Sequence, residues 1–183
     1  MKNTNLFQGI RIYLDAMNQN DAETLVAWSR DSEYLRNLDT DIARPRSVEF
    51  YEESIQSSNS DSDMIELGIR TLEDDVLIGF VALHSFEWNN RTACVSIGIG
   101  DKNYRNNGYG TEAVKLILKY AFNELNLNRV GLDVIGNNKA AIRCYEKAGF
   151  KTEGIIREGV IRDGVKQNRI YMGILYKEWK SEK

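Results

Sequence analysis

The stretch CVSIGIGDKNYRNNGYGTEA, residues 94–113, carries the most informative pattern in the chain. It predicts an apolar strand, a polar loop that ends in RNNGYG at residues 105–110, and a helix that begins at Thr111. Glycine at 108 and at 110 allows backbone conformations and close approaches that a Cβ atom would block. The following helix adds unpaired N–H groups and the positive end of its dipole. The pattern therefore predicts an anion site that suits a diphosphate, with Lys102 and Arg105 adding positive charge at its rim.

A second pattern, NKAAIRCYEKAGF at residues 138–150, follows at a fixed spacing. Together the two patterns resemble the GNAT superfamily of acetyl-coenzyme A-dependent N-acetyltransferases. Its phosphate motif, Arg/Gln-x-x-Gly-x-Gly/Ala, is matched by Arg105, Gly108 and Gly110. Its next motif is matched by Asn138, Ala141, Tyr145, Gly149 and Phe150. The resemblance spans essentially the whole chain and is strongest from residue 91 to residue 179.

The resemblance implies acetyl-CoA as co-substrate and a set of residues that bind it. In the family the two central strands splay apart, and the pantetheine arm enters the gap beside strand backbone groups. Glycines at such a position permit close approach or a bulge. Asn138 is expected to bind the pantetheine amides, although capping of its helix would explain it equally well. The implied binding residues are Gly98, Ile99, Gly100, Arg105, Asn106, Asn107, Gly108, Tyr109, Gly110, Thr111 and Asn138.

Tyr145 is the catalytic residue that the resemblance implies, placed beside the thioester sulfur as general acid. Full proton transfer from an unperturbed tyrosine, with a pKa near 10, to a thiolate of pKa about 8.5 is uphill by roughly 2 kcal/mol. Direct acetyl transfer to an amine needs no covalent nucleophile, and Cys94 and Cys144 are expected to pack in the structure. The general base stays open. Cys94 and Ser96 stand where some family members carry a glutamate, and His84 and Glu87 could act through water.

The composition predicts one compact domain over residues 1–183, since 183 residues with 42% hydrophobic content can bury a core. Two cysteines and no leader-like or membrane-spanning apolar run favour a reduced, cytoplasmic setting. A net charge of −3 and the lack of a basic block argue against nucleic acid as a partner. No metal is expected, and a homo-oligomer is left open.

Hydrophobic periodicity and turn signals predict an α/β (α+β) fold with a mixed, mostly antiparallel twisted sheet, splayed central strands and flanking helices. A helix capped by Asn20, with Glu23 completing a capping box, follows the first strand. The polar tract 57–63 is a loop, and Asp163-Gly164 turns a hairpin. The expected strands are 9–17, 64–71, 76–85, 92–99 and 129–135, with two more flanking 163–164, and the expected helices begin near residues 20, 48, 111 and 139.

Two other functional classes remain as alternatives. Residues 108–113 also satisfy the dinucleotide fingerprint G-x-G-x-x-A, with Asp133 near the expected distance for a ribose carboxylate. The polar loop 101–107 and the three antiparallel-looking strands that come first argue against that interpretation. A non-catalytic coenzyme A-binding module is the other alternative, and the presence of Tyr145 argues against it.

The amine acceptor is the least determined feature. The closing segment from Gly154 to Trp179 resembles the branch that contains ribosomal-protein N-terminal acetyltransferases and spermidine acetyltransferases. A polyamine site should be ringed with carboxylates, and the acidic residues between 39 and 53 are interrupted by Arg44 and Arg46. The sequence therefore favours a protein or peptide N-terminal amine, with a polyamine as the alternative and small-molecule detoxification also open.

Overall fold

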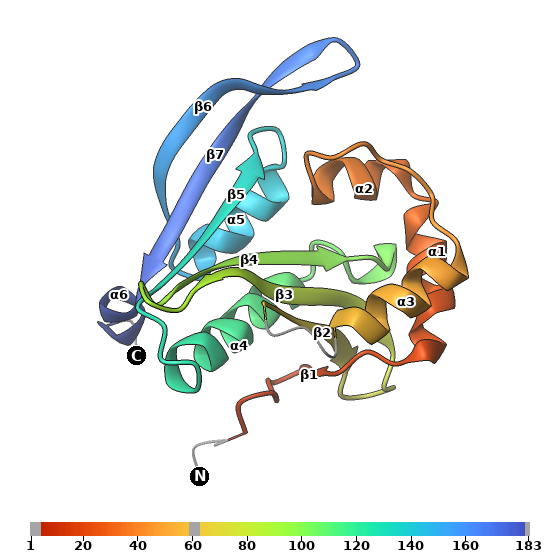
Figure 1. Ribbon diagram of the computed structural model, residues 1–183, viewed down its shortest axis with the longest axis horizontal. Coiled ribbons are helices and arrows are strands. Elements are labelled where there is room, and N and C mark those ends of the chain that lie inside the picture. Colours follow the sequence, from red (N-terminus) through yellow and green to blue (C-terminus); the bar gives the residue numbers. More distant parts are fainter. Residues whose placement is uncertain (1–4, 59–62, 182–183) are drawn as a thin grey trace.

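A seven-stranded sheet forms the centre of the computed structural model, which describes residues 5–58 and 63–181 (Figure 1). The strand order is β1-β2-β3-β4-β5-β7-β6, and every neighbouring pair is antiparallel except β4 and β5, which run parallel. The predicted mixed, mostly antiparallel fold is confirmed. The strands are β1 (Ile12–Asp15), β2 (Met64–Thr71), β3 (Leu77–Glu87), β4 (Thr92–Ile99), β5 (Arg129–Ile135), β6 (Lys151–Arg162) and β7 (Val165–Leu175).

Helices cover both faces of the sheet, and each face has its own hydrophobic core (Figure 1). The larger core joins α4 and α5 to the sheet, and the smaller one lies beneath α1, α2 and α3. None of the described helices is long and apolar enough to cross a bilayer. The helices are α1 (Ala22–Ser29), α2 (Ser32–Leu38), α3 (Val48–Ser58), α4 (Tyr109–Asn123), α5 (Lys139–Lys147) and α6 (Tyr176–Ser181), with 3-10 turns η1 (Gln19–Asp21) and η2 (Lys102–Tyr104).

The two central strands separate part of the way along their length. β4 and β5 pair only from Thr92 opposite Arg129 to Cys94 opposite Gly131. Beyond that point β4 continues to pair with β3, and β5 with β7, so each strand keeps one partner while the two diverge. The predicted splay is therefore confirmed. It leaves backbone groups of residues 95–99 and 132–135 without a ladder across the gap, as a bound chain of amides would require.

α4 forms where the apolar periodicity predicts it, and its buried stripe of Ala113, Val114, Ile117, Leu118 and Ala121 packs on the sheet. It begins at Tyr109, two residues before the predicted start at Thr111, because Gly108 itself is the N-cap residue. Gly149 adopts the expected left-handed conformation after α5, with φ of 97°. The Asp163-Gly164 turn is also confirmed, with φ of 52° and 74°.

The region before β2 differs most from the prediction. The first strand is shorter than the predicted range 9–17, and α2 was not anticipated at all, nor was α6. The predicted cap at Asn20 with Glu23 is wrong. Asn18 caps instead, and its N–H donates to the Asp21 carboxylate at 2.9 Å, because the chain first makes a 3-10 turn. Part of the predicted loop 57–63 lies outside the described residues, and its first two residues belong to α3.

A buried ion pair anchors this helical region to the sheet. Asp21 in η1 accepts from Arg70 on β2 at 2.6 Å, and the two side chains are only 8% and 12% exposed. Breaking one partner of such a pair leaves an uncompensated buried charge, which costs far more than a surface pair. The contact therefore fixes where α1 begins, and through α1 it sets the position of α2 above the gap between β4 and β5.

Candidate active site

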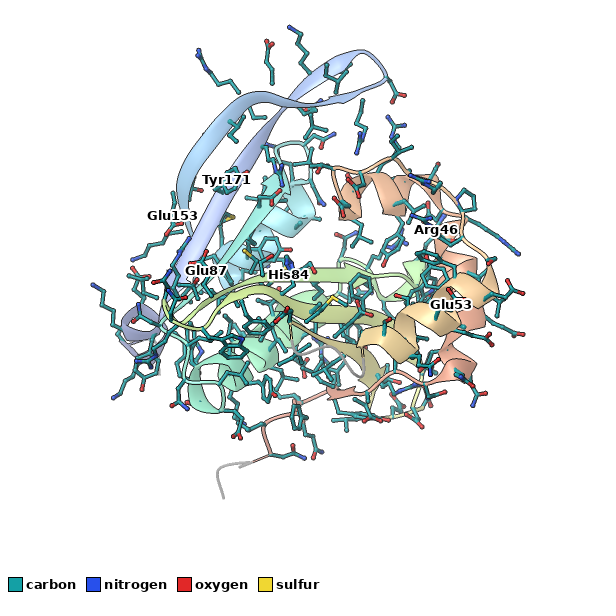
Figure 2. All side chains as sticks on the ribbon, in the orientation of Figure 1. Arg46, Glu53, His84, Glu87, Glu153 and Tyr171 are labelled. Carbon is teal, nitrogen blue, oxygen red and sulfur yellow. The ribbon has the colours of Figure 1, made fainter. Side chains whose placement is uncertain are left out.

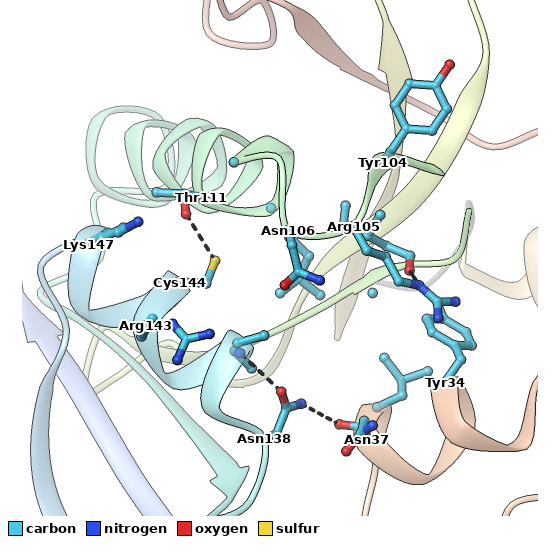
Figure 3. Close-up of a pocket in the computed structure, with 18 of the residues that line it drawn as sticks. Tyr34, Asn37, Tyr104, Arg105, Asn106, Thr111, Asn138, Arg143, Cys144 and Lys147 are labelled. Atoms are coloured by element: carbon cyan, nitrogen blue, oxygen red, sulfur yellow. Dashed lines mark hydrogen bonds between the residues drawn. The ribbon is translucent and has the colours of Figure 1, made fainter. Parts of the chain in front are cut away.

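A cavity of about 410 Å³ lies where β4 and β5 separate, between α2, the loop before α4, and α5 (Figure 3). The structure brings most of the sequence-predicted binding residues to its wall. These are Gly98, Ile99, Arg105, Asn106, Gly108, Gly110, Thr111 and Asn138. The remaining predicted residues, Gly100, Asn107, Tyr109 and Tyr145, lie around the cavity without lining it.

The N-terminus of α4 opens onto this cavity without a side-chain cap. Gly108 is the N-cap residue, has φ of 86°, and offers no side chain to the first-turn N–H groups. Asn106 is also left-handed, with φ of 61°. Successive backbone N–H groups in such a conformation form an anion-binding concavity. A Cβ on Gly110 would reach only ordinary contact distances, 3.6 Å from Cys144 and 3.7 Å from Ile99, so glycine here leaves room for a ligand rather than relieving a clash.

Arg105 is engaged by the protein itself. Its guanidinium donates to the Ile99 carbonyl at 2.9 Å, to the Gly100 carbonyl at 2.7 Å and to the Asp31 carboxylate at 3.0 Å. The side chain thereby ties the phosphate loop to the end of β4 and to the N-cap of α2. Gly100 lies directly against the Trp28 indole. A Cβ at this position would overlap the ring, so only glycine fits here.

Asn107 and Tyr109 support the loop from its outer side. The Asn107 carbonyl accepts from the Arg11 guanidinium at 3.0 Å, and that guanidinium lies 4.3 Å from the Tyr109 ring centroid. Arg11 also pairs with Glu112 in the first turn of α4 at 3.0 Å. These contacts hold the outer face of the loop against the chain just before β1.

Asn138 both caps α5 and bridges the cavity. Its Oδ1 accepts from the Ala141 N–H at 3.1 Å, which makes it the N-cap that the sequence allowed. Its Nδ2 donates to the Asn37 carbonyl at the far side, on α2, at 3.2 Å (Figure 3). Further along α5, Arg143 and Lys147 also line the cavity from successive turns. This pair was not among the predicted residues, although its i, i+4 spacing on the helix that follows Asn138 places both side chains on one face.

Tyr145 lies in the main core and not on the wall of the cavity. The side chain is 6% exposed, and its ring meets Phe150 edge-on at 5.7 Å between centroids. Burial raises the pKa of the Tyr145 hydroxyl, with smaller upward contributions from Cys144 and Asp133. Two fully enclosed side-chain atoms lack a hydrogen bond in the described part of the chain, Tyr34 Oη and Arg162 Nε, and the Tyr145 hydroxyl is not one of them.

A polar face lies on the side of the sheet opposite α4. His84, which Figure 2 labels on β3, pairs with Cys94 on β4, and Cys94 pairs with Gly131 on β5. The side chains of His84 and Cys94 therefore share one face, and so does Asp133, two residues after Gly131. Arg169 holds the Asp133 carboxylate at 2.5 and 2.9 Å. Burial raises the pKa of Cys94 and lowers that of His84, and Asp133 adds a smaller upward push to both.

The β6–β7 hairpin reaches across this polar face to the region of α2. Asp163 at its tip pairs with Arg36 at 2.7 Å. The neighbouring Arg162 donates to the carbonyls of Asp39 and Asp41 at 3.2 and 3.1 Å. The hairpin and the α2 region therefore meet above the sheet and bound the approach to the polar face from two sides.

Comparison with known proteins agrees with this geometry. The family model "Acetyltransferase (GNAT) domain" matches residues 11–151. The chain is 33% identical over 143 residues to a protein of Bacillus subtilis named putative ribosomal N-acetyltransferase YdaF, with 76% of each chain covered. A crystal structure of a probable acetyltransferase superposes with a TM-score of 0.81 at 28% identity, covering 93% of this chain and 96% of that one.

A crystal structure described as spermidine N-acetyltransferase from Vibrio cholerae in complex with CoA and spermine superposes with a TM-score of 0.83. It is 23% identical and covers 93% of this chain and 98% of that one, so it supports the fold alone. The family match over most of the chain, the splayed strands and the uncapped helix N-terminus agree with one another. The chain therefore belongs to the GNAT family of N-acetyltransferases.

Proposed function

We propose that this protein transfers an acetyl group from acetyl-CoA to the N-terminal amine of a protein or peptide, by direct attack within a ternary complex. The observation that carries the proposal is the cavity in the gap between β4 and β5, which has the uncapped N-terminus of α4 on its wall. Its walls fit the donor, since they supply N–H groups for phosphate oxygens and unpaired strand amides for a pantetheine arm.

The donor would be held by backbone groups more than by side chains. In this proposal the N–H groups from Gly108 to Thr111 receive the diphosphate, and Gly98 and Ile99 offer strand backbone groups to the pantetheine amides. Asn106 and Asn138 complete the wall. Arg143 and Lys147 add positive charge from α5. Arg105 acts mainly by holding the loop, because each of its three guanidinium nitrogens already donates to a protein group.

Tyr145 would assist departure of the thiolate. The bond that forms joins the amine nitrogen to the acetyl carbon, and the bond that breaks joins that carbon to sulfur, so negative charge collects on sulfur. Burial raises the pKa of the Tyr145 hydroxyl, which makes full proton transfer to a thiolate less favourable than in water. We therefore assign Tyr145 a strong hydrogen bond to the departing sulfur, with the proton retained on the phenol until water protonates the thiolate.

The attacking amine must lose a proton, and His84 is positioned to take part. Its burial lowers its pKa, so the neutral imidazole prevails at pH 7 and can accept a proton directly or through water. His84 shares the polar face with Cys94 and Asp133, beneath the approach between α2 and the hairpin. Glu87 is more exposed and lies at the end of β3, farther from the splay.

The acceptor class is supported by the similarity to the protein named as a putative ribosomal N-acetyltransferase. A polyamine is the second candidate, because carboxylates flank the acceptor side at Asp39, Asp41 and Asp133. The Asp133 carboxylate is paired with Arg169, and the Arg162 guanidinium lies against the backbone carbonyls of Asp39 and Asp41. Both arginines place positive charge among these carboxylates, so the acceptor side is less negative than three free aspartates would make it.

The test is thiol release from acetyl-CoA with a panel of N-terminal peptides, polyamines and aminoglycosides, and Tyr145→Phe serves as the matched variant. The proposal expects turnover with peptides and a large loss in the variant. Turnover only with polyamines would replace the acceptor class. Coenzyme A binding without turnover on any acceptor would instead favour a non-catalytic coenzyme A-binding module, and binding of NADH in place of coenzyme A would contradict the proposal.

A further inference from the structure

A second cavity, of about 140 Å³, lies under α1, α2 and α3 on the face of the sheet opposite α4. It shares Tyr34 and Leu38 with the larger cavity. The junction lies over Gly98, where an added Cβ would collide with the Tyr34 hydroxyl and would stand 2.9 Å from Leu38 and 3.0 Å from Phe80. The absence of a side chain at Gly98 therefore lets Tyr34 and Leu38 pack directly on β4. These two side chains form the boundary that the second cavity shares with the larger one.

Glu66 is the single carboxylate on the wall of the second cavity. It pairs across the sheet with Ala82, which pairs in turn with Ser96, so the Glu66 side chain lies on the same face as Ser96 with only a methyl group between them. Burial alone raises its pKa, and no cation contributes. Within residues 5–58 and 63–181, no hydrogen bond or ion pair satisfies this carboxylate. A partly buried carboxylate without a partner is costly, so a cation bound beside Glu66 would stabilise its charged form.

The Tyr34 hydroxyl is a second unsatisfied group at the same place. Its side chain is 9% exposed, and its oxygen is fully enclosed without a hydrogen bond to any described residue. Leaving a buried hydroxyl unpaired is unfavourable, and folded proteins normally avoid it. Two unpaired polar groups on the wall of one small cavity indicate that both are completed by something that enters it.

Aromatic rings surround these two groups. Trp28, Tyr34, Tyr51 and Phe80 line the cavity, and Trp28 meets Tyr34 edge-on at 6.5 Å between centroids. Aromatic faces attract an ammonium group, and a carboxylate beside them adds a full countercharge. The rest of the lining is the polar Ser54 together with the aliphatic or thioether side chains Met17, Leu25, Leu35, Leu38 and Ile55. The volume is close to that of a cavity which holds benzene, so a chain of about five heavy atoms fits.

We infer that this cavity binds an alkylammonium group carried by the acceptor, with Glu66 as its countercharge and the Tyr34 hydroxyl as a hydrogen-bond acceptor. The inference rests on the proposed acetyl transfer and narrows its substrate class to amines that carry a second, aliphatic ammonium. The group held here is not the one acetylated. Pairing with a carboxylate keeps an amine protonated, whereas the reacting amine must be neutral. The second ammonium belongs either to a diamine or polyamine or to a lysine side chain near a peptide N-terminus.

Direct binding tests the cavity without relying on turnover. Titration of the full chain with 1-aminobutane and with 1-butanol, followed by calorimetry in the presence of CoA, compares a cation with a neutral molecule of the same size. The inference expects 1-aminobutane to bind, 1-butanol to bind far more weakly, and Glu66→Gln to weaken 1-aminobutane about tenfold or more. Glu53→Gln, on the exposed side of α3, is the matched control and should change nothing.

Equal binding of the two probes, or binding of neither, would overturn the inference. Thermal melting of Glu66→Gln beside the unaltered chain establishes that the variant is folded. Because Gln has the same shape as Glu and removes a buried charge that lacks a partner, its melting temperature should be unchanged or higher. If Glu66 does not pair with the ammonium, the preference for 1-aminobutane over 1-butanol would be the same in Glu66→Gln as in the unaltered chain.

Turnover then separates the two sources of the ammonium. Acceptors are 1,4-diaminobutane, a short peptide with lysine near its N-terminus, and the same peptide with norleucine in place of lysine. Glu66→Gln should raise KM about tenfold or more for whichever ammonium-bearing acceptor is used, and it should leave the norleucine peptide and the KM for acetyl-CoA unchanged. Absence of thiol release with every acceptor would contradict the acetyl transfer, while the 1-aminobutane titration would still decide the cavity.

Discussion

Arg105 donates to the Asp31 carboxylate at 3.0 Å, and this contact joins the phosphate loop to the N-cap of α2. Asp31 also accepts from the Tyr34 N–H at 3.3 Å. Burial pushes the pKa of Asp31 upward, but the hydrogen bonds from Tyr34 and Arg105 outweigh it and leave the pKa below its usual value. One carboxylate therefore sets the position of two walls of the main cavity, although Asp31 does not itself line it.

We expect Asp31→Asn to weaken acetyl-CoA binding from outside the cavity. The change removes the charge that holds Arg105, so the free energy of unfolding should fall by about 1–3 kcal/mol and the KM for acetyl-CoA should rise. Urea melts and initial rates measure the two effects, with Asp74→Asn on the exposed β2–β3 turn as control. If Arg105→Ala weakens acetyl-CoA binding while Asp31→Asn does not, Arg105 binds the donor directly, and the proposal that it acts by holding the loop is wrong.

Substitution of the two glycines Gly108 and Gly110 should affect stability and acetyl-CoA binding differently. Gly108→Ala places a Cβ on a residue with φ of 86°, so we expect a loss of about 1–2 kcal/mol in the free energy of unfolding together with weaker acetyl-CoA binding. Gly110→Ala meets only atoms at ordinary contact distance, so stability should hold while its methyl group narrows the cavity and lowers acetyl-CoA affinity. Thermal melts and CoA titrations distinguish these patterns. Equal stability losses would show that Gly110 serves the fold and not the ligand.

The sequence predicted the features that depend on local periodicity and on backbone conformation. β2, β4 and β5 occupy the predicted ranges, because alternation and turn residues bound them on both sides. The glycines at 108, 149 and 164 have positive φ, as their positions in turns and caps required. These signals are local, so they can be recognised in the sequence without knowledge of the tertiary contacts.

The features it missed depend on contacts between distant segments. α2 has few apolar residues, and it stands above the gap because Arg105, 74 residues later in the chain, holds its N-cap. Arg105 matched a phosphate motif, yet its donors go to protein groups that sequence could not place nearby. Asp133 looked like a ribose ligand by spacing, and it pairs with Arg169 across β5 and β7. No sequence motif marks the second cavity, because its lining residues come from segments that are distant in the chain.

Arg162→Ala should impair the acceptor without affecting the donor. Its guanidinium donates to the carbonyls of Asp39 and Asp41 and so fixes the hairpin tip against the region after α2, on the side of the polar face. We expect the KM for the acceptor to rise severalfold while the KM for acetyl-CoA stays constant. Steady-state rates with each substrate varied in turn measure this, and Lys166→Ala on the solvent side of β7 is the control. A matching rise in the KM for acetyl-CoA would show that the hairpin shapes the donor site instead.

Tyr145→Phe should lower kcat by about 10²-fold, since a hydrogen-bond donor aimed at the charge that develops in the transition state contributes about that much. The ring packs against Phe150, so the phenyl replacement keeps the core filled, and the KM for acetyl-CoA should change little. Rapid-quench or steady-state thiol release measures the loss. Because burial raises the pKa of Tyr145, the phenol stays protonated across the working range, and no alkaline limb below pH 10 should belong to it. An unchanged kcat would remove Tyr145 from the mechanism.

His84→Gln should remove a pH-dependent part of the stability. Burial lowers the pKa of His84, and Asp133 and Asp39 oppose this only partly. The unfolded chain therefore binds the His84 proton more readily than the folded one, so this residue costs stability as pH falls below about 6.5 and costs nothing above it.

The sign of that effect gives a direct measurement. The free energy of unfolding of His84→Gln, minus that of the unaltered chain, should increase as the pH is lowered from 7.5 to 5, so that the variant becomes relatively more stable, as followed by urea melts at each pH. If His84 also accepts the amine proton, the acid limb of kcat/KM should lie below pH 6.5 and vanish in the variant. A stability difference that does not vary with pH would mean that His84 titrates as it does in the unfolded chain, and the neutral, partly buried imidazole assigned to the polar face would be wrong.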